Sequence, residues 1–582
     1  MRHTQLGLVF SVALSACAAG AVFPAEVQQA FRQEPMLRAE TRHLILYYPA
    51  RRQAMVERFA VRADACAGAL KSRAQHHGAA WAEKMTLTMP ETAFNNAYVS
   101  GKQFGSPDIS VVPTFFALDF ATEFGLPPDP GFVACHELVH YVHSQQIGGL
   151  WAGLNAVMGD LYTPQLGFDP WFFEGLATHY EAALQPGAGR PTWPLFTGMF
   201  AAAYAGKTVN GGDLSELGRE SPVGHHYLVG TMFVRFLIER YGEAALWKAI
   251  AEQSSTWTGL LSARSFRKAL GRSLGDLLDE FDAWQRQRFL ARARPAAQRK
   301  LATAGNDARY ARSRQGSEAW IADDLDLPTR LIVREADGRV RAVVPLAGLV
   351  PPRALVIAVP LLISGLSMTA DGQEVWFTAI DLGATSQTTR LMRWRAKGGL
   401  QEIARGLGAG GTVDATGAHY YFLAVDGDRW SLAVLDLATR ATRTLLDAAP
   451  GTYVLTAQLS PDGRVVAASA WNGAAFVVWL IDAATGALRR ELAGDGPVYD
   501  PAFLDDGRLV HLAAVEGRFQ VQVRSAEGGT PLTMTDAPYA TLSPRGNGTT
   551  LRFLNREGWS WTLDEAPVSY THLRAHETDS YL

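Results

Sequence analysis

The hydrophobic and polar positions of the chain follow different patterns in its two halves. In the first half, residues 41–48 and 85–89 alternate between apolar and polar side chains, as β-strands do. Helices, marked by apolar residues every three to four positions, are expected at residues 51–72, 132–146, 227–241 and 274–289. The second half consists of short β runs separated by glycine turns. The pattern predicts a multidomain chain in which an α+β domain precedes an all-β domain.

The β runs of the second half repeat with a nearly constant period. Glycines in equivalent turns lie 41–46 residues apart, at Gly372, Gly417, Gly463, Gly507 and Gly548. This period suits one four-stranded blade of a β-propeller, in which an Asp-Gly turn joins two antiparallel strands. A weaker unit at residues 314–344 adds an earlier blade, so five or six blades are expected. A β-sandwich, the alternative, fits the even spacing less well.

The strongest chemical signal is the motif HELVH at residues 136–140. On a helix, positions four residues apart share one face, so His136 and His140 can offer two imidazole nitrogens to one metal ion, with Glu137 beside them. A catalytic zinc also needs a third protein ligand and an open position for water. Glu174, in the aromatic-rich segment WFFEG at residues 171–175, is the best candidate. The two motifs therefore predict a His2Glu zinc site.

HELVH, the run YVHSQQIGGLWAGLNAVMGD after it and the segment PWFFEGLATHYE together resemble the gluzincin metallopeptidases. The nearest group is the bacterial peptidase-MA-like group, which is related to the M1 aminopeptidases. The resemblance implies that His136, His140 and Glu174 bind one Zn2+ ion. It also implies that Glu137 is the general base that deprotonates the zinc-bound water and hands the proton to the leaving amine.

Further features belong to the same resemblance. Tyr227 stands where related enzymes carry a tyrosine whose hydroxyl hydrogen-bonds the developing oxyanion. In many such peptidases a TolB-like propeller follows, and SPDG at residues 460–463 resembles TolB and related PD40 repeats. No GAMEN-like segment, which fixes the free amino terminus in aminopeptidases, precedes HELVH, so endopeptidase activity is expected. Residues 100–113 instead read as a loop and an edge strand able to pair with an extended peptide.

Other side chains are candidates for a supporting shell around the metal, namely His143, Glu181, His225 and His226. Each also has a plain structural interpretation, such as a place on a solvated helix face. The alternative function is a non-catalytic envelope-binding or scaffold protein with a degenerate peptidase domain. A purely structural zinc would normally recruit a fourth protein ligand.

The amino terminus has the features of an export signal. Residues 1–25 combine a short basic start with an apolar stretch that is too short to span a membrane permanently. Residues 14–17, LSAC, resemble the lipobox of bacterial lipoproteins, in which Cys17 is lipidated. Ordinary cleavage near Ala18 or Ala25 is the alternative. We expect an exported, periplasmic protein that contacts the outer membrane through a lipid anchor only.

Composition excludes one class of partner. The formal net charge of −3 and the hydrophobic content of 48% describe an ordinary globular chain without a nucleic-acid footprint. The expected partners are a peptide or protein substrate and an envelope protein bound through the propeller. Besides Cys17, the chain has only Cys66 and Cys135, which either form a disulfide in an oxidising compartment or remain buried thiols.

The domain boundaries follow from these patterns. We expect the metallopeptidase domain at residues 26–292, a basic, alanine-rich linker at residues 293–315 and the propeller at residues 316–567. Residues 568–582 resemble the translation of a sequencing adaptor and are expected to contribute nothing to the fold or to a site. On this interpretation the gene is truncated, so the propeller is expected to lack blades and to leave its ring open.

Overall fold

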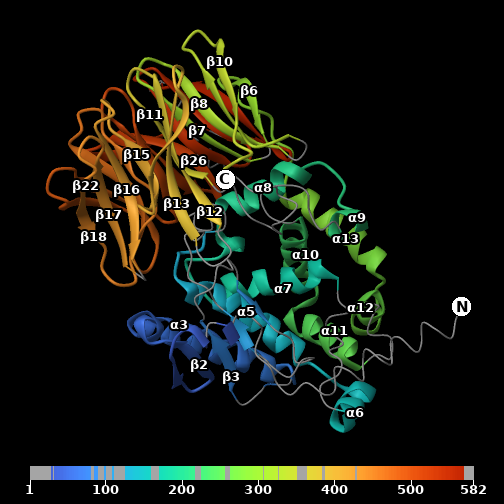
Figure 1. Cartoon of the computed structure of the whole chain (residues 1–582). Coiled ribbons are helices and arrows are strands. Elements are labelled where there is room, and N and C mark those ends of the chain that lie inside the picture. The colour runs from blue at the N-terminus through green and yellow to red at the C-terminus, as the bar shows by residue number, and fades with distance from the viewer. Residues whose placement is uncertain are drawn as a thin grey trace, which may run out of the picture.

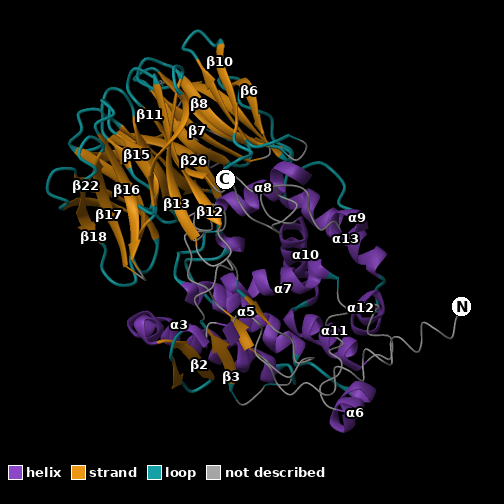
Figure 2. Cartoon of the chain, in the orientation of Figure 1, coloured by secondary structure: helices purple, strands orange, loops and turns teal. Residues whose placement is uncertain are grey.

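The chain has two parts, a mainly helical N-terminal part and a β-propeller, which pack against each other (Figure 1, Figure 2). The computed structural model describes residues 28–568, apart from residues 30–31, 80, 82–83, 90–96, 100–107, 111–124, 159–168, 216–224, 256–261, 306, 325–326, 350–362, 383–386, 427–428 and 536. The predicted signal peptide, Cys17 and the tail after Val568 lie outside the described residues. Their assignments stay predictions.

A small mixed sheet opens the helical part. Its strands are β1 (Met36–Glu40), β2 (Leu44–Pro49), β3 (Met85–Thr88), β4 (Tyr98–Val99) and β5 (Asp108–Ser110). They are ordered β1-β2-β3-β5-β4, with β2, β3 and β5 parallel and the two outer strands antiparallel to their neighbours. Leu44, Leu46 and Leu87 are fully buried, because alternate side chains of a strand face the core.

Helices dominate the rest of the described residues of this part. They are η1 (Ala50–Arg52), α3 (Gln53–His76), α5 (Pro130–Ser144), α6 (Gly149–Met158), α7 (Pro170–Ala183), η4 (Arg190–Thr192), α8 (Pro194–Tyr204), α9 (Gly211–Ser215), α10 (His225–Tyr241), α11 (Glu243–Ser255), α12 (Ser262–Leu270) and α13 (Leu274–Arg288). Proline in the first turn starts α5 and α7, where its missing N–H costs no helical hydrogen bond. The Asp129 side chain caps α5 by accepting a hydrogen bond from the Gly131 N–H. The starts of α5 and α7 are thus set by local sequence signals.

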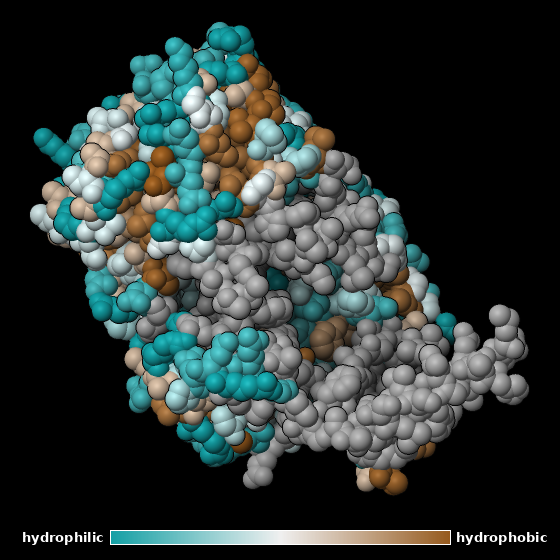
Figure 3. All heavy atoms as spheres, in the orientation of Figure 1, coloured by the Kyte–Doolittle hydropathy of each residue, from teal (hydrophilic) through white to brown (hydrophobic). Residues whose placement is uncertain are grey.

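Helix α6 lies between the two metal-binding motifs in the sequence and exposes apolar side chains. Leu150, Leu154 and Val157 are 44%, 36% and 86% exposed. In the view of Figure 3 a hydrophobic patch lies at the lower edge of the molecule, where Figure 1 places α6, whereas hydrophilic and hydrophobic residues intermingle over the propeller. Within the described part of the chain, no helix is long and apolar enough to cross a membrane.

A disulfide joins Cys66 of α3 to Cys135 of α5. The two Cα atoms are 5.8 Å apart, within the usual range for a disulfide. The bond spans a sequence separation of 69 residues and ties α3 to the helix that carries His136. Of the two alternatives that the sequence leaves open, the structure contains the bonded one.

Removing this disulfide should destabilise the protein. A cross-link restricts the unfolded chain, and for a loop of this length the entropic contribution is about 4 kcal/mol. We expect the Cys66→Ser/Cys135→Ser variant to lose about 2–4 kcal/mol of unfolding free energy, measured by chemical denaturation. Reduced wild-type protein, the matched control, should unfold at the same midpoint as the variant. An unchanged midpoint in the variant would contradict a stabilising role for the bond.

The second part is a β-propeller whose described residues form six antiparallel sheets, numbered as blades in chain order. The strands are β7 (Asp307–Arg312), β8 (Glu318–Asp323), β9 (Arg330–Arg334) and β10 (Val340–Pro345) in blade 1; β11 (Ile363–Met368), β12 (Glu374–Leu382), β13 (Gln387–Arg395) and β14 (Gly399–Arg405) in blade 2; β15 (Ala409–Val413), β16 (His419–Asp426), β17 (Arg429–Asp436) and β18 (Thr442–Asp447) in blade 3; β19 (Tyr453–Val454), β20 (Gln458–Leu459), β21 (Val465–Trp471), β22 (Phe476–Asp482) and β23 (Leu488–Leu492) in blade 4; β24 (Val498–Phe503), β25 (Leu509–Val515), β26 (Arg518–Ser525) and β27 (Gly528–Thr533) in blade 5; and β28 (Thr541–Gly546), β29 (Thr550–Glu557), β30 (Ser560–Pro567) and β6 (Arg299–Gly305) in blade 6.

The repeating glycines occupy the first turn of successive blades. Gly372, Gly417, Gly463 and Gly507 have positive φ angles of 69–85°, a conformation in which a side chain would be strained. Gly548 lies in the equivalent turn between β28 and β29. The predicted period is therefore one blade, and the weaker unit at residues 314–344 belongs to blade 1.

The ring is closed, so the prediction of an open ring is wrong for the described residues. β6, from the expected linker, pairs with β30 and completes blade 6, and β28 lies next to β7. Residues 299–305 and 307–312 therefore form propeller strands, and the predicted linker at residues 293–315 is corrected accordingly. β6 is difficult to recognise from the sequence because it begins with the charged residues Arg299 and Lys300. Both side chains are exposed, and they pair with Glu565 and Glu557.

Candidate metal centre

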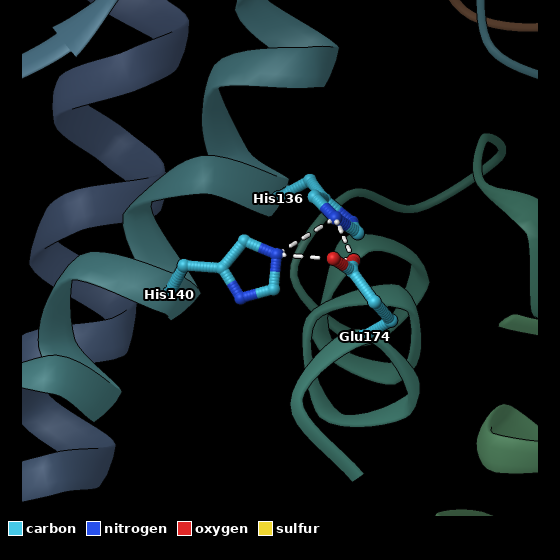
Figure 4. A group of neighbouring side chains, drawn as sticks. All are labelled: His136, His140 and Glu174. Carbon is cyan, nitrogen blue, oxygen red and sulfur yellow. Dashed lines mark hydrogen bonds and ion pairs between the residues drawn. The ribbon is translucent and has the colours of Figure 1, made fainter. Parts of the chain in front are cut away.

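Helices α5 and α7 bring the two sequence motifs together. His136 and His140 lie one turn apart on α5, and Glu174 extends toward them from α7, which packs against α5 (Figure 4). The Nε2 atoms of the two histidines are 3.1 Å apart. The Oε2 atom of Glu174 lies 3.2 Å from Nε2 of His136 and 3.1 Å from Nε2 of His140. The three predicted ligand atoms thus converge on one point.

This triangle of atoms suits a tetrahedral metal ion. Ligand atoms bound at about 2.0–2.1 Å to a tetrahedral zinc lie about 3.3 Å from one another. The observed separations of 3.1–3.2 Å are close to that value. Across the described ranges of the chain, no second group of His, Cys, Asp or Glu side chains gathers in this way. Two imidazoles and one carboxylate form the donor set of a catalytic zinc site and leave a fourth position for water.

The electrostatics of the cluster favour a cation. Burial alone lowers the pKa of His136, but its hydrogen bonds to Glu174 and Glu181 raise that pKa to about 9. Burial likewise raises the pKa of Glu174, yet the neighbouring imidazoles, His140 foremost, hold it well below its ordinary value. The carboxylates therefore stabilise positive charge at the imidazoles. Because zinc ligands must be deprotonated, a metal ion would compete with protons for this place.

Glu137 follows the first ligand on α5 and is only 6% exposed. Burial raises the pKa of its carboxyl, and the charges of His140 and His136 oppose that rise. Carboxylates whose pKa is raised by burial are the ones that serve as general bases near neutral pH. Its position beside His136 is the one predicted from the motif.

A second layer of charge lies behind His136. Glu181, on α7, is fully buried, and its Oε2 atom is 3.3 Å from Nδ1 of His136. Arg190 donates to this carboxylate through Nε, through Nη2 at 2.5 Å and through its backbone N–H at 2.9 Å. Burial raises the pKa of Glu181, but the charge of Arg190 and the hydrogen bond of His136 lower it to about 2. Glu181 is therefore an anion that faces the back of the first ligand.

Arg190 contacts this cluster although the sequence patterns did not single it out. It lies on η4, outside both motifs and 54 residues from His136, so neither spacing nor composition marks it. The side chain is buried, with its guanidinium carbon 5.0 Å from the centre of the Tyr227 ring. Only the fold reveals that this arginine neutralises Glu181.

Tyr227 lies at the site because α7 and α10 cross in close contact. A Cβ on Gly230 would lie 2.0 Å from the carbonyl oxygen of Trp171, and a Cβ on Gly175 would lie 2.4 Å from the Gly230 backbone, so neither position accepts a side chain. Burial raises the pKa of Tyr227 well above its ordinary value, and the nearby negative charge of Glu174 adds to the rise. The Tyr227 hydroxyl is therefore a neutral donor next to the third ligand.

The remaining sequence candidates lie further out. His143 is buried, and its ring packs 5.3 Å from the Phe173 ring and 5.8 Å from the Phe172 ring, outside the metal triangle. His226 is buried with its ring 4.5 Å from that of Tyr227. His225 is the first residue of α10, and its side chain lies outside what the structure describes.

No protein-family model and no curated protein matches the chain. Among solved structures, TolB from Acinetobacter baumannii is 15% identical with a TM-score of 0.33, and the match covers 53% of this chain and 70% of that one. A gluconolactonase from Xanthomonas campestris is 16% identical with a TM-score of 0.33, covering 47% and 91%. Oligogalacturonate lyase from Vibrio parahaemolyticus is 13% identical with a TM-score of 0.32, covering 47% and 94%. The β-rich part has TolB-like propeller neighbours, and the likeness carries nothing about activity.

Proposed function

We propose that this chain is a gluzincin-type zinc metallopeptidase that hydrolyses peptide bonds in the bacterial cell envelope. The observation that carries the proposal is the convergence of His136, His140 and Glu174, with ligand atoms 3.1–3.2 Å apart. Three protein ligands with an open fourth position are typical of catalytic zinc, whereas structural zinc has four. Glu137 next to the first ligand supplies the base that such chemistry needs.

Each residue of the site has a distinct task in this mechanism. Bound Zn2+ would lower the pKa of a water molecule and polarise the scissile carbonyl. Glu137 accepts the proton of that water and passes it to the leaving amine. The Tyr227 hydroxyl donates a hydrogen bond to the oxyanion as it forms. Glu181, whose Oε2 atom lies 3.3 Å from Nδ1 of His136, would accept the Nδ1–H of that histidine when Nε2 binds the metal.

The small sheet offers a place for an extended peptide. Among the described strands of this sheet, β4 ends the strand order, pairs with β5 on one side and lies next to α5. An edge strand can accept a substrate strand through main-chain hydrogen bonds, which suits an endopeptidase. The edge expected within residues 100–113 is shifted, because the described part of that segment forms β5, an internal strand. The rest of that segment lies outside the described residues.

The zinc content of the full-length mature chain tests this proposal. We expect one zinc per chain by elemental analysis and cleavage of casein or of a quenched-peptide library. A chelator should stop cleavage, and added zinc should restore it. A folded chain that binds no zinc and cleaves neither casein nor the peptide library would contradict the proposal.

Tyr227→Phe should slow hydrolysis without removing zinc. The substitution deletes only the hydroxyl, and losing one oxyanion donor lowers kcat by about 10²–10³-fold. Peptide cleavage kinetics and elemental analysis measure the two effects separately. Tyr241→Phe is the matched control, because the Tyr241 hydroxyl on the same helix binds Glu280 instead of a metal ligand. Equal rates in both variants would remove Tyr227 from the mechanism.

The rival function is a non-catalytic envelope-binding protein whose propeller docks a partner. In its favour, the first strands of all six blades surround an axial cavity of about 110 Å³. Arg312, Arg545 and Asp505 line this cavity. Both functions fit an exported protein tethered to the outer membrane through Cys17, which stays a proposal. Loss of hydrolysis in Glu137→Gln would favour the peptidase, whereas a binding protein would be unaffected by that change.

A further inference from the structure

The segment between α7 and α8 connects the candidate metal centre to the propeller. Arg190 lies at the metal side of this segment, and Trp193 follows three residues later. Trp193 is 2% exposed, and its ring lies 4.8 Å from that of Phe476, 4.9 Å from that of Phe519 and 5.5 Å from that of Tyr499. These three rings belong to blades 4 and 5. Trp193 therefore packs against three aromatic side chains of the propeller.

The backbone of the same segment packs closely against both α7 and the propeller. Gly189 has a φ of 99°, and a Cβ there would lie 2.9 Å from the Cα atom of Ala182 on α7. Gly187 has a φ of 83°, and a Cβ there would lie 2.9 Å from the carbonyl oxygen of Ala474 in blade 4. The path of the chain into Arg190 thus depends on both neighbours.

Blade 4 also touches the ligand helix. Phe132, one turn before His136 on α5, packs edge-on against Trp471, with ring centroids 5.6 Å apart. Gln185, in the segment after α7, donates a hydrogen bond of 3.1 Å to the carbonyl oxygen of Phe132. The propeller therefore supports α5 and the segment that carries Arg190 at the same place.

We infer that Arg190 is a positioning residue of the metal site and that the propeller holds it in place through Trp193. This inference rests on the proposed zinc site. A metal-binding His136 needs an acceptor for its Nδ1–H, and the Oε2 atom of Glu181, 3.3 Å away, is that acceptor. The Nη2 atom of Arg190 is only 2.9 Å from Nδ1, but a guanidinium cannot accept a hydrogen bond.

The task of Arg190 is therefore to fix Glu181. Its planar guanidinium donates hydrogen bonds from Nε and Nη2 to the Oε2 atom of Glu181. Its backbone N–H donates a hydrogen bond to the Oε1 atom. Without this partner, a fully buried carboxylate loses its counter-charge, and the acceptor behind His136 is no longer held. The propeller is then a structural component of the metal site as well as a neighbouring domain.

Zinc affinity of full-length variants tests the inference by competition with a chromophoric chelator. Arg190→Met should weaken zinc binding by about 10–100-fold, the range for losing a supporting residue of a metal ligand. Trp193→Ala should weaken it in the same direction. The double variant should bind no more weakly than Arg190→Met alone, because both changes break one chain of contacts. Arg190→Lys, which keeps the charge, should recover part of the affinity.

Trp559→Ala is the matched control. Trp559 lies in the turn between β29 and β30 and packs 5.8 Å from Tyr204 of α8, elsewhere in the same interface. Its loss should leave zinc affinity unchanged. If Trp193→Ala does not fold by circular dichroism, Phe519→Leu, which removes one ring while keeping apolar bulk, replaces it.

The outcomes separate this inference from the proposed function. Tight zinc binding that is unchanged in Arg190→Met and Trp193→Ala would overturn the inference alone. Fully additive losses in the double variant would overturn the link between the two residues. A folded wild-type chain without zinc would overturn both the inference and the proposed function.

Discussion

Glu137→Gln is expected to abolish hydrolysis while the protein keeps its zinc. Glutamine has nearly the same shape as glutamate but cannot accept a proton from water, and general-base catalysis contributes about 10²–10⁴-fold to the rate. Zinc should remain, because the converging ligand atoms belong to His136, His140 and Glu174. Peptide cleavage kinetics together with elemental analysis measure both quantities on one preparation.

Glu252→Gln is the control for this variant. Glu252 lies on α11 and pairs with Lys268 at 2.9 Å, so the same chemical change occurs away from the site. Its rate and zinc content should equal those of the wild type. An active Glu137→Gln variant would contradict the mechanism, and loss of zinc in that variant would show that Glu137 holds the metal or the fold.

Glu174→Ala is expected to lose zinc and activity together. The substitution removes the third ligand and leaves two imidazoles on one helix, which cannot complete a catalytic site. It also removes a negative charge that acts on the Tyr227 hydroxyl. Loss of a supporting residue weakens zinc binding by about 10–100-fold. We expect loss of the ligand Glu174 to weaken it by more than that. Chelator competition on folded protein gives this ratio directly.

Two further variants serve as comparisons for the zinc affinity of Glu174→Ala. Glu239→Ala on α10 removes a carboxylate that pairs with Arg235, and zinc binding should not change. Glu181→Gln removes the charge behind His136 but no ligand, so its effect should fall between the control and Glu174→Ala. Zinc binding at wild-type strength in Glu174→Ala would show that the predicted ligand set is wrong.

The contact between the two parts decides which protein should be used in these experiments. Trp193, Phe132, Trp471, Phe476 and Tyr499 all belong to one continuous hydrophobic core that crosses from the helices into the propeller. Cutting the chain between the parts would expose this aromatic surface and release the segment that holds Arg190. The full-length chain is therefore the proper object for zinc and activity measurements.

The sequence by itself determined the local features of this protein. The i, i+4 spacing of His136 and His140 predicts one helix face, because helix geometry depends only on neighbouring residues. A second helical motif supplied Glu174, and the structure brings all three atoms together. The turn glycines predicted the blades for the same reason, since each turn requires a backbone conformation that glycine adopts at its own position.

Only the tertiary structure decided which distant segments meet. Pairing of β6 with β30 closes the ring between strands more than two hundred residues apart, and charged residues such as Lys300 gave no local sign of it. The Cys66–Cys135 bond and the contact of Arg190 with Glu181 likewise depend on how α3, α5, α7 and η4 pack. The physical reason is that such contacts gain their energy from burial and charge pairing across the core, which local periodicity does not encode.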